Sequence, residues 1–143
     1  MATYLVVANQ TAISPELTAA LLEKTKEEPQ ANFFLLVPAT QLEHLVIGEE
    51  GQAREIAARR AGKALTHLTD AGIHIVGAGV GAASPEEAVG MELRARPNVY
   101  DGIIISTFPK GASRWLETGA GPAMEQRFSL PVTHVTAELH HKS

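Results

Sequence analysis

Cysteine, an excess of basic residues and a long hydrophobic run are all missing from this 143-residue sequence. Without cysteine the chain has no disulfide bond, no thiol nucleophile and no thiolate metal ligand. Acidic residues outnumber basic ones by 16 to 12, and the net charge of −4 argues against a nucleic-acid partner, which normally meets a basic stripe. The first apolar stretch, Tyr4–Ala8, follows no basic segment and is too short for a signal peptide or a membrane span. We therefore expect a cytoplasmic protein with no membrane partner.

The sequence also lacks the motifs that are typical of a catalytic or metal site. Ser106 does not stand in the Gly-x-Ser-x-Gly turn of a hydrolase. The glutamate pairs Glu49–Glu50 and Glu86–Glu87 lie at predicted helix starts, where they complement the helix dipole rather than form a catalytic pair. The histidines do not have metal-ligand spacing; they are His44, His67, His74, His134, His140 and His141. The sequence therefore predicts no catalytic residue and no metal ligand.

The composition that remains is typical of one globular domain. Hydrophobic residues make up 45% of the chain and charged residues 20%, and the length suffices to bury a real core. The sequence has no internal repeat and no change of composition that would mark a second domain. We expect a single domain over residues 1–143, with residues 137–143 as a flexible tail because that end is polar.

Short apolar runs alternate with helical patterns along the whole chain. The predicted strands are Tyr4–Ala8, Phe33–Val37, Ile73–Val76, Ile103–Ile105 and Pro131–Thr136. The predicted helices begin at Pro15, run over Glu49–Ala71, extend from Pro85 to about Arg96, and run over Ala123–Phe128. This alternation predicts an α/β fold: a three-layer α/β/α sandwich, Rossmann-like, around a five-stranded parallel sheet. Its natural strand order is 3-2-1-4-5, with the topological switch point between the first and fourth strands.

Serine, proline and glycine predict where several elements begin and end. Ser14 and Ser84 each precede Pro-Glu, so both are predicted N-caps with proline at the first helical position. Ser84-Pro-Glu-Glu87 is in addition a predicted capping box, in which the serine side chain would bond to the backbone of the first turn. Gly72 is predicted to end the second helix. The alternate glycines of residues 77–81 are expected to form a loop that leaves the third strand.

The segment Asp101–Trp115 is the best candidate for a functional site. It runs from the fourth strand into a loop, and ligands of open parallel sheets bind beyond the carboxyl ends of strands at the switch point. The segment carries three hydroxyls and two cations that could hold a phosphate or a carboxylate: Ser106, Thr107, Ser113, Lys110 and Arg114. A solvated surface loop could have the same composition, so the position in the predicted fold is the argument for a site.

Polar and small residues of other strands are expected to face the same crevice. Asn9 could hydrogen-bond a ribose or a base edge, although it could equally begin a turn before the first helix. Thr11 lies beside it, and Val37 would contribute its backbone at the end of the second strand. Gly79 and Gly111 would let the backbone approach a ligand closely.

The layout of the chain resembles the universal stress protein family. The similarity lies in the first strand ending Val-Val-Ala-Asn9-Gln-Thr11, in Ile73–Gly81 followed by Ser-Pro-Glu-Glu-Ala-Val89, in Asp101–Ser106 and in Pro131–Val135. The family's acidic residue at the end of the first strand falls on Asn9 here. The resemblance implies a universal-stress-protein-like domain that binds ATP or AMP and forms a homodimer through the fifth strand, Val132–Thr136.

The sequence departs from the loop of the family's ATP binders, Gly-x2-Gly-x9-Gly-Ser/Thr. Aligned on the strand end, the four positions hold Ser106, Pro109, Gly119 and Ala120. Aligned on the later glycines, they hold Phe108, Gly111, Gly121 and Pro122. Neither register is complete, and these glycines let backbone N–H groups approach phosphates. The chain therefore resembles a divergent member.

Three functions remain open from the sequence. The first is a non-catalytic binding protein for a nucleotide or another small anion, with a role in stress response or regulation. The second is an enzyme on the same fold that hydrolyses a nucleotide or transfers a phosphoryl or nucleotidyl group, although no paired acids or Mg²⁺-binding aspartate follow the strands. The third is a ligand-free dimeric interaction module, which the incomplete glycine pattern favours.

Overall fold

A computed structural model describes residues 2–9, 11–39, 50–82, 84–107 and 120–137. The described elements, in chain order, are β1 (Thr3–Val7), α1 (Pro15–Glu27), β2 (Asn32–Pro38), α2 (Glu50–Asp70), β3 (Ile75–Gly81), α3 (Pro85–Ala95), β4 (Gly102–Thr107), α5 (Ala120–Phe128) and β5 (Val132–Thr136). None of the helices in this part of the chain has the length and apolar character that a bilayer span needs.

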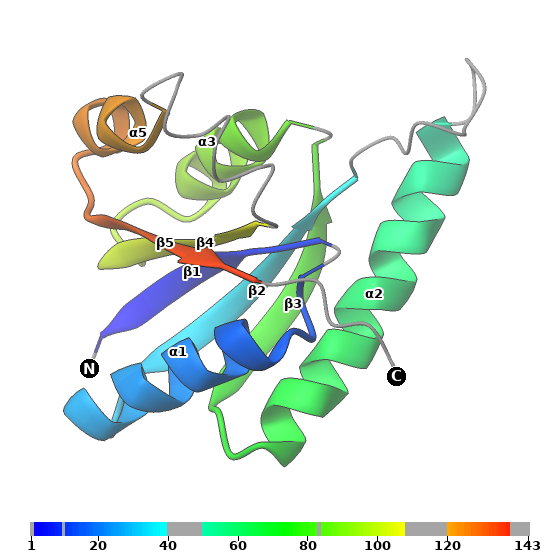
Figure 1. The fold of residues 1–143 in the computed structure, drawn as a ribbon. Helices are drawn as coiled ribbons and strands as arrows, with labels where there is room; N and C mark the ends of the chain where they lie inside the picture. Colours follow the sequence, from blue (N-terminus) through cyan, green and yellow to red (C-terminus); the bar gives the residue numbers. More distant parts are fainter. Residues whose placement is uncertain (1, 10, 40–49, 83, 108–119, 138–143) are drawn as a thin grey trace.

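The five strands form one parallel sheet in the order β3-β2-β1-β4-β5. Helices α1 and α2 cover one face of the sheet, and α3 and α5 cover the other (Figure 1). The predicted α/β/α architecture and strand order are therefore confirmed. Strand order reverses between β1 and β4, so the switch point lies between these two strands.

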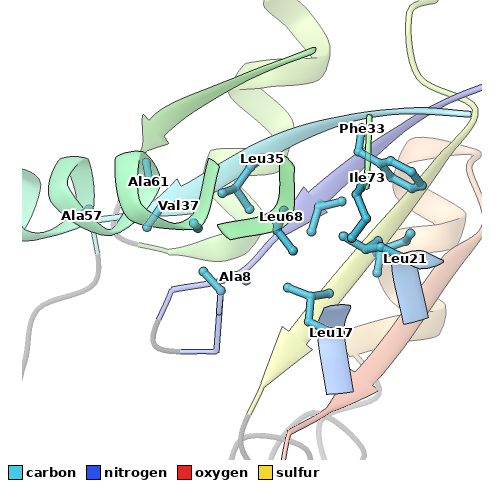
Figure 2. Packing of buried hydrophobic residues seen from close by; sticks show 14 of the residues in the cluster. Ala8, Leu17, Leu21, Phe33, Leu35, Val37, Ala57, Ala61, Leu68 and Ile73 are labelled. Carbon is cyan, nitrogen blue, oxygen red and sulfur yellow. The ribbon is translucent and has the colours of Figure 1, made fainter. Parts of the chain in front are cut away.

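Each face of the sheet has its own hydrophobic core, because successive side chains of a strand point to opposite faces. Val6 of β1 packs with Leu17, Leu21 and Leu68 under α1 and α2, the cluster shown in Figure 2. Leu5 and Val7, the neighbours of Val6 in β1, point to the other face. They pack under α3 and α5 with Val89, Met124, Ile103 and Ile105. Burying each large side chain contributes roughly 1.5 to 3 kcal/mol.

Two of the three predicted helix boundary signals are confirmed. The Ser14 Oγ accepts a hydrogen bond from the Leu17 N–H at 3.1 Å, and Gly72 ends α2 with a left-handed φ of 95°. Ser84 does occupy the N-cap position of α3, but its side chain makes no capping bond, so the predicted capping box is wrong. Ser84 is exposed, and water can satisfy the first N–H groups of α3 instead.

The third strand is longer than predicted, and the glycines of residues 77–81 lie inside it rather than in a loop. Pairing with β2 continues to the end, with Gly79 opposite Leu36 and Gly81 opposite Pro38. At Gly81 the packing leaves no room for a side chain. A Cβ on Gly81 would lie 2.7 Å from the Ala88 Cβ, so glycine is what lets α3 approach the sheet.

Other strand and helix ends also differ from the predicted bounds. The predicted second strand ends at Val37, whereas β2 includes Pro38 as its last residue, and Pro38 pairs with Gly81 of β3. Proline is tolerated at a strand end. Strand β4 extends to Thr107, and α5 begins at Ala120 instead of Ala123.

Candidate functional site

The carboxyl ends of β1 and β4 meet at the switch point, as the predicted site requires. The Thr11 hydroxyl, on the turn that follows β1, donates a hydrogen bond of 3.1 Å to the backbone oxygen of Ser106. Thr11 is 3% exposed and Ser106 6% exposed, so this bond is buried. It fixes the turn before α1 against the end of β4.

The Ser106 side chain is an exception to the rule that buried polar groups are paired. Its Oγ is buried and makes no hydrogen bond to any part of the chain that the structure describes. A buried hydroxyl without a partner costs roughly 1 to 3 kcal/mol, so natural sequences seldom keep one without another reason. A group able to donate to or accept from this oxygen would recover that cost.

The Asn9 amide makes two hydrogen bonds at the end of β1. Its Nδ2 donates to the Pro38 backbone oxygen at 2.6 Å, and its Oδ1 accepts from the Arg60 guanidinium of α2. Asn9 therefore ties the ends of β1 and β2 to α2, and each of its two polar atoms keeps one further hydrogen-bonding position. Arg60 was not among the predicted site residues. The sequence did contain one indication of its role, because Arg60 lies on the otherwise apolar face of α2, beside Ala57 and Ala61.

Thr107 points to the opposite face of the sheet from Ser106, as adjacent strand residues must. Its Oγ1 lies 2.7 Å from the Nε2 of His134 on the neighbouring strand β5. Burial lowers the pKa of His134. The Thr107 hydroxyl is thus part of a polar pair between the two strands rather than a free ligand group.

This pair makes a pH dependence of stability testable. A lowered pKa means that the unfolded chain takes up a proton before the folded protein does, so stability present above about pH 6.5 should be lost as the pH falls through the pKa of folded His134. In His134→Gln, this part of the decline should be absent from urea-unfolding curves measured between pH 7.5 and 5. His74→Gln, which removes an exposed histidine, is the matched control. An unchanged pH dependence in His134→Gln would contradict the assignment.

Two further predicted residues, Val37 and Gly79, have side chains or neighbours that belong to the packed interior of the sheet. Val37 is fully buried, with its side chain in the core beneath α2 (Figure 2), and it pairs with Val80 of β3. Gly79 faces the ring of Phe34, whose Cζ would lie 3.5 Å from an added Cβ. The guanidinium of Arg96 stacks on this ring at 4.6 Å from its centroid. The glycine therefore belongs to a packed layer of the sheet.

The remaining predicted site residues, Lys110, Gly111, Ser113 and Arg114, lie outside the described residues. Of the predicted set, the structure brings Asn9, Thr11, Ser106 and Thr107 together at the carboxyl ends of β1 and β4. Within the described ranges, no group of three or more His, Cys, Asp or Glu side chains is placed to hold a metal ion.

These features define an open α/β domain with polar residues at its switch point, the class to which many nucleotide-binding folds belong. Comparison with protein-family models and with curated proteins gave no match. Several solved structures share the fold, and two of them are compared with this chain. One is a universal stress protein family member from Burkholderia pseudomallei, with a TM-score of 0.58 and 13% identity over 93% of this chain and 94% of that one.

The other is a universal stress protein family protein from Arabidopsis thaliana solved with AMP bound. Its TM-score is 0.57 at 15% identity, with 96% of this chain and 92% of that chain covered. Both structures are similar to this chain over nearly its whole length. The chain therefore has the fold of universal stress proteins, and the resemblance found in the sequence is confirmed at the level of the fold.

Proposed function

We propose that this protein binds a nucleotide or another small anion, without turning it over, at the carboxyl ends of β1 and β4. The observation that carries the proposal is the buried Ser106 hydroxyl at the switch point, which has no hydrogen-bond partner among the residues that the structure describes. A ligand that pairs with this hydroxyl would explain a buried polar group that the described part of the fold does not use. A binding role in stress response or regulation follows from the same proposal.

AMP and ATP are the ligands to test first. The fold neighbour from Arabidopsis thaliana holds AMP, which supports a nucleotide for this fold. The sequence places two cations, Lys110 and Arg114, just after β4, where they would meet phosphate oxygens. The incomplete glycine pattern of the same segment favours AMP or a simple anion over ATP, because close approach to a triphosphate needs those glycines.

A homodimer through β5 is the second part of the proposal. β5 is an edge of the sheet and pairs only with β4 among the described strands, so its outer side can accept another strand. The Val132 N–H already donates a hydrogen bond to the Glu125 Oε1 at 3.0 Å. Pairing of two β5 strands would therefore have to displace Glu125 or begin beyond Val132. Sedimentation equilibrium measures whether the dimer forms.

A titration of thermal unfolding tests ligand binding directly. AMP at 100 times its dissociation constant should add about 2.7 kcal/mol to the free energy of unfolding, with ATP and pyrophosphate titrated in parallel. The double variant Lys110→Ala/Arg114→Ala should lose this stabilisation, because two charges that would hold the phosphate are removed. The control Lys26→Ala/Arg94→Ala removes two exposed cations elsewhere and should retain it. No stabilisation by any of these ligands at millimolar concentration would contradict the proposal.

A further inference from the structure

A groove of about 440 Å³ lies on the α1 side of the sheet, away from the carboxyl ends of the strands. One wall is a single face of α1, because Ala20, Glu23, Lys24 and Glu27 follow at helical spacing. The floor is formed by the amino-terminal half of β4 and by Thr133 and Val135, which share a face of β5. Its volume lies within the range of small-molecule sites.

The floor of the groove is apolar and its mouth is acidic. Ile104 and Val135 supply branched aliphatic surface that belongs to the core layer beneath α1. Three carboxylates, Glu23, Glu27 and Asp101, stand around it with one lysine, Lys24. The lining thus has a formal charge of −2, from three negative side chains and one positive one.

The acidic side chains at the mouth are not all neutralised by the chain itself. Lys24 is engaged by Glu28 at 3.2 Å, and Glu27 lies further from it, at 4.0 Å. Glu23 is exposed and makes no ion pair with the described residues. Asp101 accepts a hydrogen bond from the Thr3 N–H at 2.8 Å, which orients its carboxylate without neutralising the charge.

The groove already accommodates one ammonium group. The Lys24 Nζ lies over the ring of Tyr4, 4.8 Å from its centroid. The Tyr4 hydroxyl donates to Glu28, the carboxylate that also holds Lys24. Hydrogen bonding to Glu28 raises the pKa of Lys24, which shows that the surroundings favour the cation. An aromatic face next to carboxylates is the arrangement that proteins use to bind amines.

We propose that this groove is a second binding site, which takes a small organic cation with an apolar body, such as an alkylamine or an arylamine. The apolar part would lie on Ile104 and Val135, and the ammonium would face Glu23 and Glu27 at the mouth. The site is independent of the proposed anion site, since the groove shares none of its lining residues with it. The net negative charge of the lining disfavours an anion here.

Nuclear magnetic resonance titration with two probes of similar size and opposite charge tests the proposal. 2-Phenylethylamine should shift the amide signals of Gly102, Thr133 and Val135 in a saturable way, and 3-phenylpropanoate should not. The Glu23→Gln/Glu27→Gln double variant should bind the amine about tenfold more weakly, because each exposed ion pair contributes up to about 1 kcal/mol. The control Asp70→Asn/Glu87→Gln makes the same change of charge at exposed positions outside the groove and should bind normally.

A second variant tests the volume of the groove rather than its charge. Thr133→Phe places an aromatic ring on the floor and should abolish the amine shifts, while circular dichroism verifies the fold. Equal shifts with both probes, no shifts with either, or unchanged affinity in the glutamine double variant would each overturn the proposal. The same signals could instead shift with protein concentration alone, and the amine could then fail to bind. That result would assign the groove to a second copy of the chain. AMP binding is measured on the same samples and should not change.

Discussion

Gly81→Ala is expected to lower the free energy of unfolding by about 1 to 3 kcal/mol, the usual cost of overpacking a tight interface. The new methyl group would lie 2.7 Å from the Ala88 Cβ of α3 and 3.0 Å from a methyl of Leu36. Ala88 is held by its own helix backbone and cannot move away alone, so α3 would have to shift from the sheet. Urea unfolding measures the loss.

Gly79→Ala is the matched control, two residues along the same strand. Its added methyl would lie 3.5 Å from the Phe34 ring, an ordinary contact, so stability should change little or rise slightly. Equal losses in the two variants would contradict the packing explanation and indicate a general intolerance of side chains in β3. A loss of AMP binding in Gly79→Ala at unchanged stability would show instead that this glycine serves a ligand.

Ser106→Ala is expected to raise the free energy of unfolding of the ligand-free protein by about 1 kcal/mol. The variant removes a buried hydroxyl that has no partner, and with it the desolvation cost of that group. The same change should weaken AMP binding about tenfold, because the hydroxyl would be the group that the ligand pairs. Stability gained at the expense of binding is the usual mark of a functional polar residue.

Thr11→Val separates this effect from simple repacking of the crevice. The substitution keeps the shape of the side chain but removes the bond to the Ser106 backbone oxygen, which leaves a buried acceptor without this partner. Stability should therefore fall by about 1 to 2 kcal/mol, opposite in sign to Ser106→Ala. A loss of stability in Ser106→Ala would show that its hydroxyl has a structural partner. A gain in stability of Ser106→Ala without any change in AMP affinity would remove the main support for the proposed site.

Much of the fold could be predicted because local signals agree along the chain. The run Tyr4–Ala8 is apolar at every position, which only a strand buried on both faces requires, and Ser14-Pro15 marks the start of α1 without ambiguity. The boundaries of β3 could not be predicted in the same way. Its alternate glycines have the local preference of a loop, and pairing with β2 overrides that preference.

The candidate site shows a similar division. Position in the fold was sufficient to bring Asn9, Thr11, Ser106 and Thr107 to one edge of the sheet, because carboxyl ends of neighbouring parallel strands must meet there. Which of these side chains is available was not predictable. Asn9 is engaged by Arg60, a residue 51 positions away, and Thr107 by His134, 27 positions away.

The sequence by itself determined the class of fold, the order of the strands and the edge where a site should lie, since periodicity and chain connectivity are local properties. Only the tertiary structure decided that the glycines of β3 serve the packing of α3, that Ser106 is the unpartnered hydroxyl, and that an acidic groove lies beside α1. Each of these depends on contacts between residues far apart in the chain, and no local pattern specifies such contacts.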